Sequence, residues 1–127
     1  MRIAYISADP GVPVFGSKGC SIHVQEVLRA LLKRGAEVDL LATSCQGNAP
    51  KSLEAVRLHP LPPAPKGELA VREQLSLSAN DQLLGALRKL GGAGLEGRAF
   101  DLIYERYSLW SFAGMEYGRA TGTPAVL

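Results

Sequence analysis

Cysteine is scarce in this chain of 127 residues, which has only Cys20 and Cys45, well separated in sequence. A disulfide framework needs more cysteines, and the two do not have metal-ligand spacing. We expect both to be small buried thiols in a reducing compartment. The composition therefore argues against the disulfide-rich secreted class.

Long hydrophobic runs are also missing. No stretch approaches the roughly 20 apolar residues that cross a bilayer, and the first residues lack the apolar core and cleavage site of a signal peptide. We expect a cytoplasmic protein. No strongly basic amphipathic helix stands out, so peripheral contact with a membrane surface stays open.

Charge of one sign does not dominate either. Fourteen basic and twelve acidic residues are scattered and give a net charge of +2, which lacks the clustered basic surface of a nucleic-acid binder. With 46% hydrophobic and 20% charged residues, the chain has the composition of a folded globular protein. Its length fits one domain over residues 1–127.

What the sequence does contain is an alternation of strand and helix patterns. Val24, Val27, Leu28 and Leu31 form an apolar stripe on a helix that should stop at Gly35. The other expected elements are strands at 2–7, 37–42, 56–58, 100–105 and from 123 onward, and helices at 68–90 and 109–119. This order predicts an α/β, Rossmann-like, doubly wound fold with a mainly parallel sheet and helices on both faces.

Two interruptions are expected within this pattern. Four prolines in residues 59–65 predict a stiff surface loop. Residues 78–80, Ser-Ala-Asn, offer a cap and a break in the middle of the helix at 68–90. The glycines at 91–94 should end that helix.

The loop after the first strand carries glycines but matches neither common nucleotide motif. Gly11, Gly16 and Gly19 are spread too widely for the dinucleotide fingerprint. For a phosphate-binding P-loop, Ser17 intrudes before Lys18, and Gly19 stands where a hydroxyl is required. We therefore exclude a P-loop nucleoside triphosphatase and a nicotinamide-dependent oxidoreductase.

The same loop still favours an anion site. The start of a helix presents free backbone N–H groups and a positive dipole end. Lys18 adds a charge, Gly19 permits close approach of a ligand, and His23 lies one turn into the helix. A flexible connection without a ligand, with His23 bonded to nearby backbone, is the alternative.

Several segments resemble the opening of a family 4 glycosyltransferase. They are residues 2–7, 16–24, 28–38, 100–107 and 122–126. The resemblance implies the GT-B fold, with two Rossmann-like domains facing a cleft. It also implies a retaining enzyme that uses a nucleotide-sugar donor and an unidentified acceptor, without a bound metal or other cofactor.

Site roles follow from this resemblance by position. Gly19 matches the second glycine of a Gly-Gly loop near the donor diphosphate, with Lys18 in place of the first. Tyr104 and Arg106 stand where the family commonly has histidines. Arg106 can bind phosphate but cannot relay a proton. The residues expected to bind donor phosphate or sugar are Lys18, Gly19 and Arg106, and those expected at the acceptor or cleft are Gly16, Ser17, His23, Glu105 and Tyr107.

Strand alternation limits these assignments. Tyr104 and Arg106 must point to one face of the sheet, and Glu105 and Tyr107 to the other, so only one pair lines the cleft from the strand. We favour Arg106 in the cleft, although Glu105 could simply pair with it. Trp110 and Phe112 are expected to pack in the core or a domain interface. No residue is assigned a catalytic role.

Residues 123–127 read as the start of a buried strand, which suggests a truncated chain. The resemblance implies a C-terminal nucleotide-sugar-binding domain as the missing partner, so we expect the fragment alone to transfer no sugar. The alternative is a free-standing flavodoxin-like binding or regulatory module without catalysis. A receiver domain is disfavoured because Asp9 has no acidic neighbour.

Overall fold

The computed structural model describes residues 1–63, 66–91 and 99–127. Its centre is a five-stranded sheet in which every neighbouring pair is parallel, in the order β3-β2-β1-β4-β5. The strands are β1 (Arg2–Ser7), β2 (Glu37–Ala42), β3 (Arg57–Pro60), β4 (Leu102–Glu105) and β5 (Ala125–Val126). This strand order is that of a Rossmann-like sheet.

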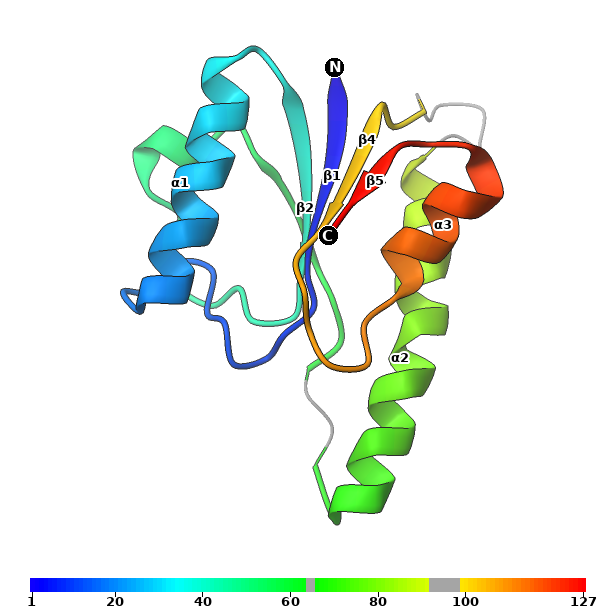
Figure 1. The fold of residues 1–127 in the computed structure, drawn as a ribbon. Coiled ribbons are helices and arrows are strands. Elements are labelled where there is room, and N and C mark those ends of the chain that lie inside the picture. The colour runs from blue at the N-terminus through cyan, green and yellow to red at the C-terminus, as the bar shows by residue number, and fades with distance from the viewer. Residues whose placement is uncertain (64–65, 92–98) are drawn as a thin grey trace.

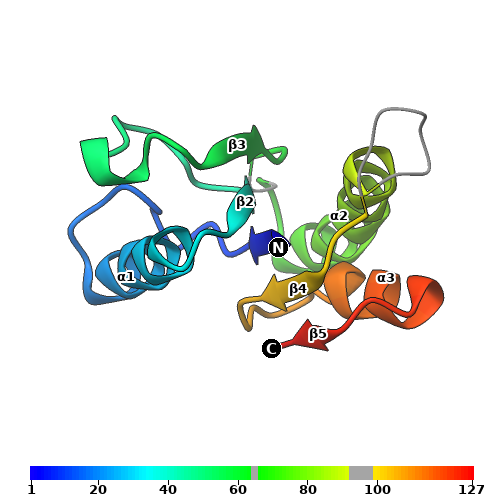
Figure 2. The same ribbon diagram turned by 90° about the horizontal axis from the view of Figure 1, so that it is seen from above.

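Helices cover both faces of the sheet. Helix α1 (Gly19–Lys33) packs on one face, and α2 (Leu69–Leu90) and α3 (Ala113–Thr121) lie on the other (Figures 1 and 2). All five strands point the same way, so their carboxyl ends and the loops that follow them gather at one edge, at the bottom of Figure 1. The predicted doubly wound fold is confirmed.

Helix α1 forms where its apolar stripe predicts it. Val24 and Leu28 are fully buried against the sheet. The chain leaves the helix through Gly35, whose φ of 84° is a conformation that glycine adopts without steric cost. Two backbone amides, of Gly35 and Ala36, bond to carbonyls of the last turn, as expected for a glycine-terminated helix.

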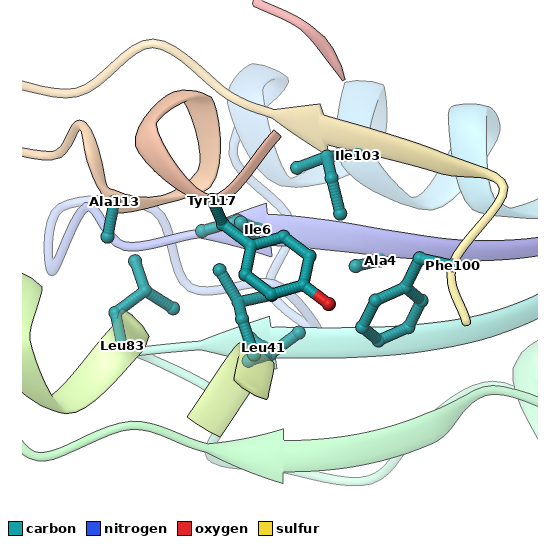
Figure 3. Close-up of a cluster of buried hydrophobic side chains, with 9 residues drawn as sticks. Ala4, Ile6, Leu41, Leu83, Phe100, Ile103, Ala113 and Tyr117 are labelled. Carbon is teal, nitrogen blue, oxygen red and sulfur yellow. The ribbon is translucent and has the colours of Figure 1, made fainter. Parts of the chain in front are cut away.

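The sheet divides the core into two clusters because alternate residues of each strand face opposite layers. Ala4 and Ile6 of β1 pack towards α2 and α3, with Leu41 and Ile103 of the neighbouring strands (Figure 3). Tyr5 of β1 packs on the other face with Val24 and Leu28 of α1. This alternation decides which side chains at the carboxyl edge can meet α1.

One charged network is buried near the amino ends of the strands. Asp39 is 1% exposed and accepts hydrogen bonds from Arg2, Arg57 and His59. Burial alone would raise the pKa of Asp39, but these bonds outweigh it and lower that pKa to about 2. The network joins the first three strands of the sheet.

The structure corrects two expectations about helices. Helix α2 is continuous through residues 78–80, because Asn80 bonds to other elements and does not cap a new helix. Helix α3 begins at Ala113, four residues later than predicted. Residues 109–112 instead form a loop, in which the Trp110 carbonyl and the Phe112 amide bond to the Asn80 side chain.

Smaller differences concern the strands and the cysteines. Strand β3 continues through His59 and Pro60, where a loop was expected; Pro60 fits because β3 is an edge strand. Residues 64–65 of the expected stiff loop and residues 92–94 of the glycine stop lie outside the described part of the chain. Cys20 and Cys45 are free thiols that are partly exposed, not buried.

Candidate functional site

The candidate site lies where β1 and β4 end side by side. From β1 the chain proceeds to β2 and β3 on one side, and it later crosses to β4 and β5 on the other. The crevice outside the carboxyl ends of two such strands is the usual ligand site of an open α/β sheet. The loops at 8–18 and 106–112 border it.

The start of α1 is open towards this edge. Lys18 occupies the N-cap in an extended conformation without a side-chain cap, and no acidic residue lies in the first turn. A Cβ atom built on Gly19 would meet nothing within 4 Å. The first backbone amides and the positive dipole end are therefore accessible to an anion.

Gly16 has a different reason to be glycine. A Cβ atom there would lie 3.0 Å from the Cγ atom of Pro13 and 3.2 Å from the Oγ atom of Ser21. The loop is folded tightly over the first turn of α1, and the side chain of Gln25 bonds to the carbonyls of Val14 and Gly16. Gly16 thus shapes the loop, while Ser17 and Lys18 beside it are exposed.

Arg106 joins the end of β4 to His23, which lies one turn into α1. The backbone amide of Arg106 bonds to the carbonyl of Ile6, which extends the pairing with β1. Its Nη1 atom donates to Nδ1 of His23 at 3.3 Å. The structure therefore brings together two residues that the sequence placed at the cleft, on the α1 face of the sheet.

Beneath Arg106, two tyrosines stack on the same face. The rings of Tyr5 and Tyr104 are 4.8 Å apart and nearly parallel, at 10°. Burial, reinforced by Tyr104, raises the pKa of Tyr5 to about 12, and the nearby guanidinium of Arg106 offsets part of that rise. The Tyr5 phenol is therefore protonated at neutral pH.

Two buried hydroxyl groups in this region have unused hydrogen-bonding capacity. The hydroxyls of Ser7 and Ser21 are buried and meet no hydrogen-bond partner within the described ranges, whereas the Tyr5 hydroxyl interacts with the Arg106 guanidinium. By strand alternation Tyr5 and Ser7 face the α1 layer, and Ser21 belongs to the first turn of α1. Buried polar groups normally find partners, so the Ser7 and Ser21 hydroxyls are candidates to bind a ligand.

Glu105 does not line the cleft, where the sequence analysis placed it. It is 0% exposed and faces the opposite layer. Its carboxylate accepts bonds from the Ser111 hydroxyl and from the amides of Gly114 and Met115 in the first turn of α3. The alternative, a pairing of Glu105 with Arg106, is also absent from the described ion pairs. Tyr107 is 69% exposed.

A cavity that the sequence analysis did not predict lies on the other face of the sheet. Its volume is about 500 Å³. It lies between the first half of α2 and the loops that follow β1, β3 and β4, and its lining includes Asp9, Leu61, Leu75 and Trp110. The one sequence feature that points to this cavity is Trp110, the single tryptophan of the chain, which follows β4.

Asn80 organises one wall of this cavity. Its side-chain amide donates to the carbonyls of Leu77 and Trp110, and its oxygen accepts from the amides of Phe112 and Ala113. Asn80 is 6% exposed. A residue of α2 therefore caps α3 and fixes the loop that carries Trp110.

Within residues 1–63, 66–91 and 99–127, no three His, Cys, Asp or Glu side chains gather in a way that could hold a metal ion. No helix in the described ranges combines the length and apolar character needed to cross a bilayer.

Comparison with known proteins finds similarity in fold. No protein-family model matches the chain, and no curated protein sequence matches it. Two crystal structures of the C-terminal domain of a hydrogenase from Pyrococcus furiosus match with TM-scores of 0.63 and 0.61, at 17% identity. Both alignments cover 98% of this chain and 88% of that domain.

The crystal structure of MurG from Acinetobacter baumannii is a further match. Its TM-score is 0.56 at 14% identity, and the alignment covers 98% of this chain but 33% of MurG. The chain thus spans about a third of MurG. These likenesses establish a shared Rossmann-like fold.

Proposed function

We propose that this chain is the N-terminal, acceptor-side domain of a retaining glycosyltransferase that uses a nucleotide-sugar donor. The observation that carries the proposal is the Arg106 side chain, which bonds to His23 beside the uncapped start of α1. A guanidinium, free helix amides and unpartnered hydroxyls together suit a phosphate-bearing ligand.

The reaction requires stabilisation of a leaving diphosphate. The acceptor hydroxyl oxygen bonds to the anomeric carbon, the bond from that carbon to the diphosphate breaks, and the nucleoside diphosphate leaves with the electron pair and takes up the hydroxyl proton. Negative charge develops on the leaving oxygen. Arg106, Lys18 and the amides at Gly19 are suited to stabilise that charge.

The fold likeness to MurG supports this assignment at a coarse level. MurG is a GT-B glycosyltransferase, and this chain aligns with a third of it. In our proposal a second domain supplies the rest of the donor site, so the 127 residues alone should bind a nucleoside diphosphate but transfer no sugar. Sugar transfer by this chain alone would contradict that arrangement.

The direct test is calorimetric titration of this chain with UDP, GDP and ADP. One charge-assisted hydrogen bond contributes about 1.5–3 kcal/mol, so R106A should weaken binding of the preferred nucleotide about 10- to 150-fold. R106K should retain part of the affinity. R119A, in the last turn of α3, is the control and should bind like the unmodified chain.

The alternative is a free-standing binding module of flavodoxin-like shape. It is favoured by the hydrogenase domain, which shares the fold and nearly the same length, since one fold hosts unrelated functions. Such a module would bind inorganic phosphate as tightly as a nucleoside diphosphate. A transferase domain should prefer the nucleoside diphosphate, and a nucleotide-sugar should compete with it. Binding that R106A leaves unchanged would refute the proposed site.

A further inference from the structure

The cavity on the α2 face has the character of a site for an uncharged ligand. Leu61, Leu75, Leu83 and Leu109 contribute apolar surface to it. Among the lining residues that the structure describes, Asp9 is the one charged residue. The Oδ1 atom of Asp9 already accepts a bond from the amide of Gly11. Without a lysine or arginine in the lining, a phosphate or carboxylate would lose hydration and gain no compensating charge.

The size of the cavity limits its occupant. About 500 Å³ lies within the range of small-molecule sites. Such a volume holds one or two rings and is too small for a folded partner. The hydroxyl of Ser76, the amide of Gln82 and the Oδ2 atom of Asp9 can bind polar atoms on such a ring compound.

Trp110 has an unfavourable backbone conformation. Its φ is 72°, and it is the one residue other than glycine with positive φ in the described ranges. That region costs an L-residue about 1–2 kcal/mol. The Asn80 amide fixes the Trp110 carbonyl, while the residue stays 41% exposed at the cavity. Backbone strain that the surroundings maintain is typical of ligand sites.

We propose that this cavity binds the acceptor, and that the acceptor is an uncharged hydroxyl compound whose aromatic ring system packs against the Trp110 indole. The assignment as acceptor rests on the proposed glycosyltransferase function. The binding of such a compound follows from the cavity itself. The ligand hydroxyl would bind the Oδ2 atom of Asp9, which belongs to the loop at 8–18 that borders both the cavity and the phosphate site at the carboxyl edge of the sheet.

The single tryptophan makes the proposal directly testable. In a ¹H–¹⁵N spectrum the chain gives one indole N–H signal, which reports on Trp110 alone. We expect 4-hydroxybiphenyl to shift this signal with saturation at submillimolar concentration. Biphenyl-4-yl phosphate should require at least tenfold more, and glucose should cause no shift.

A matched pair of variants on α2 separates the cavity from the helix surface. Leu75 lines the cavity and is 47% exposed, whereas Val71 is 50% exposed on the same helix and outside the lining. L75R should weaken 4-hydroxybiphenyl binding at least tenfold, and V71R should leave it unchanged. Both variants should bind the preferred nucleoside diphosphate like the unmodified chain.

The outcomes distinguish the two proposals. If the nucleoside diphosphate binds but millimolar 4-hydroxybiphenyl does not move the Trp110 signal, the cavity proposal is wrong and the proposed function stands. If 4-hydroxybiphenyl binds and no nucleoside diphosphate does, the cavity is a ligand site but the acceptor role is wrong. Equal binding of the phosphate ester, or equal effects of L75R and V71R, would also overturn the cavity proposal.

Discussion

The Oε2 atom of Glu105 accepts a hydrogen bond of 3.0 Å from the amide of Gly114. The Oε1 atom accepts a second bond from the amide of Met115. A carboxylate at the end of β4 thus binds the positive end of α3, so β4 and α3 are joined by charge as well as by packing.

Removal of this carboxylate should destabilise the fold. In E105A the two amides and the Ser111 hydroxyl lose their acceptor, and each unsatisfied buried donor costs about 1–3 kcal/mol. We expect the free energy of unfolding to fall by about 3 kcal/mol in urea titrations. E105Q keeps one acceptor oxygen and should lose about half as much. An E105A variant as stable as the unmodified chain would refute the capping role.

Acid should weaken the fold through Asp39. Its pKa is about 2 in the folded chain against 3.8 as its ordinary value. A lowered carboxyl pKa stabilises the fold fully above the unfolded value, and this contribution is lost as the pH falls from about 4 through 2. The contribution is about 2 kcal/mol.

The measurement is urea unfolding of the unmodified chain and of D39N from pH 6 to pH 2. D39N should be less stable at pH 6, and the difference should shrink by about 2 kcal/mol as the pH falls. A difference that stays constant over this interval would show that the Asp39 carboxylate is not specially stabilised by Arg2, Arg57 and His59.

Trp110 should reverse the usual order of alanine and glycine. At ordinary positions glycine is less favourable than alanine by about 0.5–1 kcal/mol. At a φ of 72° alanine keeps the strain that glycine lacks, so W110G should be more stable than W110A by about 1 kcal/mol. Thermal and urea unfolding measure this difference. The opposite order would mean that the positive φ is not retained.

Two helical glycines should respond oppositely to alanine. A Cβ atom on Gly114 would lie 2.6 Å from the Cδ1 atom of Ile6, whereas one on Gly85 meets nothing within 4 Å. G114A should destabilise the chain by about 1–3 kcal/mol through overpacking. G85A should stabilise it by about 0.5–1 kcal/mol, because alanine favours a helix. Equal effects in urea unfolding would contradict the close contact of α3 with β1.

The sequence predicted the elements whose signals are local. The stripe on α1 and its glycine stop, and the bounds of β1 and β2, depend on nearby residues and agree with the structure. The start of α3 was misplaced because Asn80, 33 residues before Ala113, provides its cap. A contact over that separation leaves no local pattern.

The site was predictable only in part for the same reason. Strand alternation correctly predicted that Arg106 and Glu105 face opposite sides of the sheet. In the structure Arg106 lies beside His23, and Glu105 is buried in the opposite layer. The cavity could not be read from the sequence because it is assembled from several separate segments. Its residues become neighbours only when α2 packs beside the loops.

At the end of β4, the neighbouring side chains of Glu105 and Arg106 lie on opposite faces of the sheet. One consequence concerns how such a domain can change over evolution. Substitutions along α2 can alter which compound enters the α2-side cavity without touching Arg106 or the first turn of α1. The cavity side can therefore vary while the α1 side, with Arg106 and His23, is inherited unaltered. Laboratory libraries that target the cavity should be confined to α2 and residues 108–111.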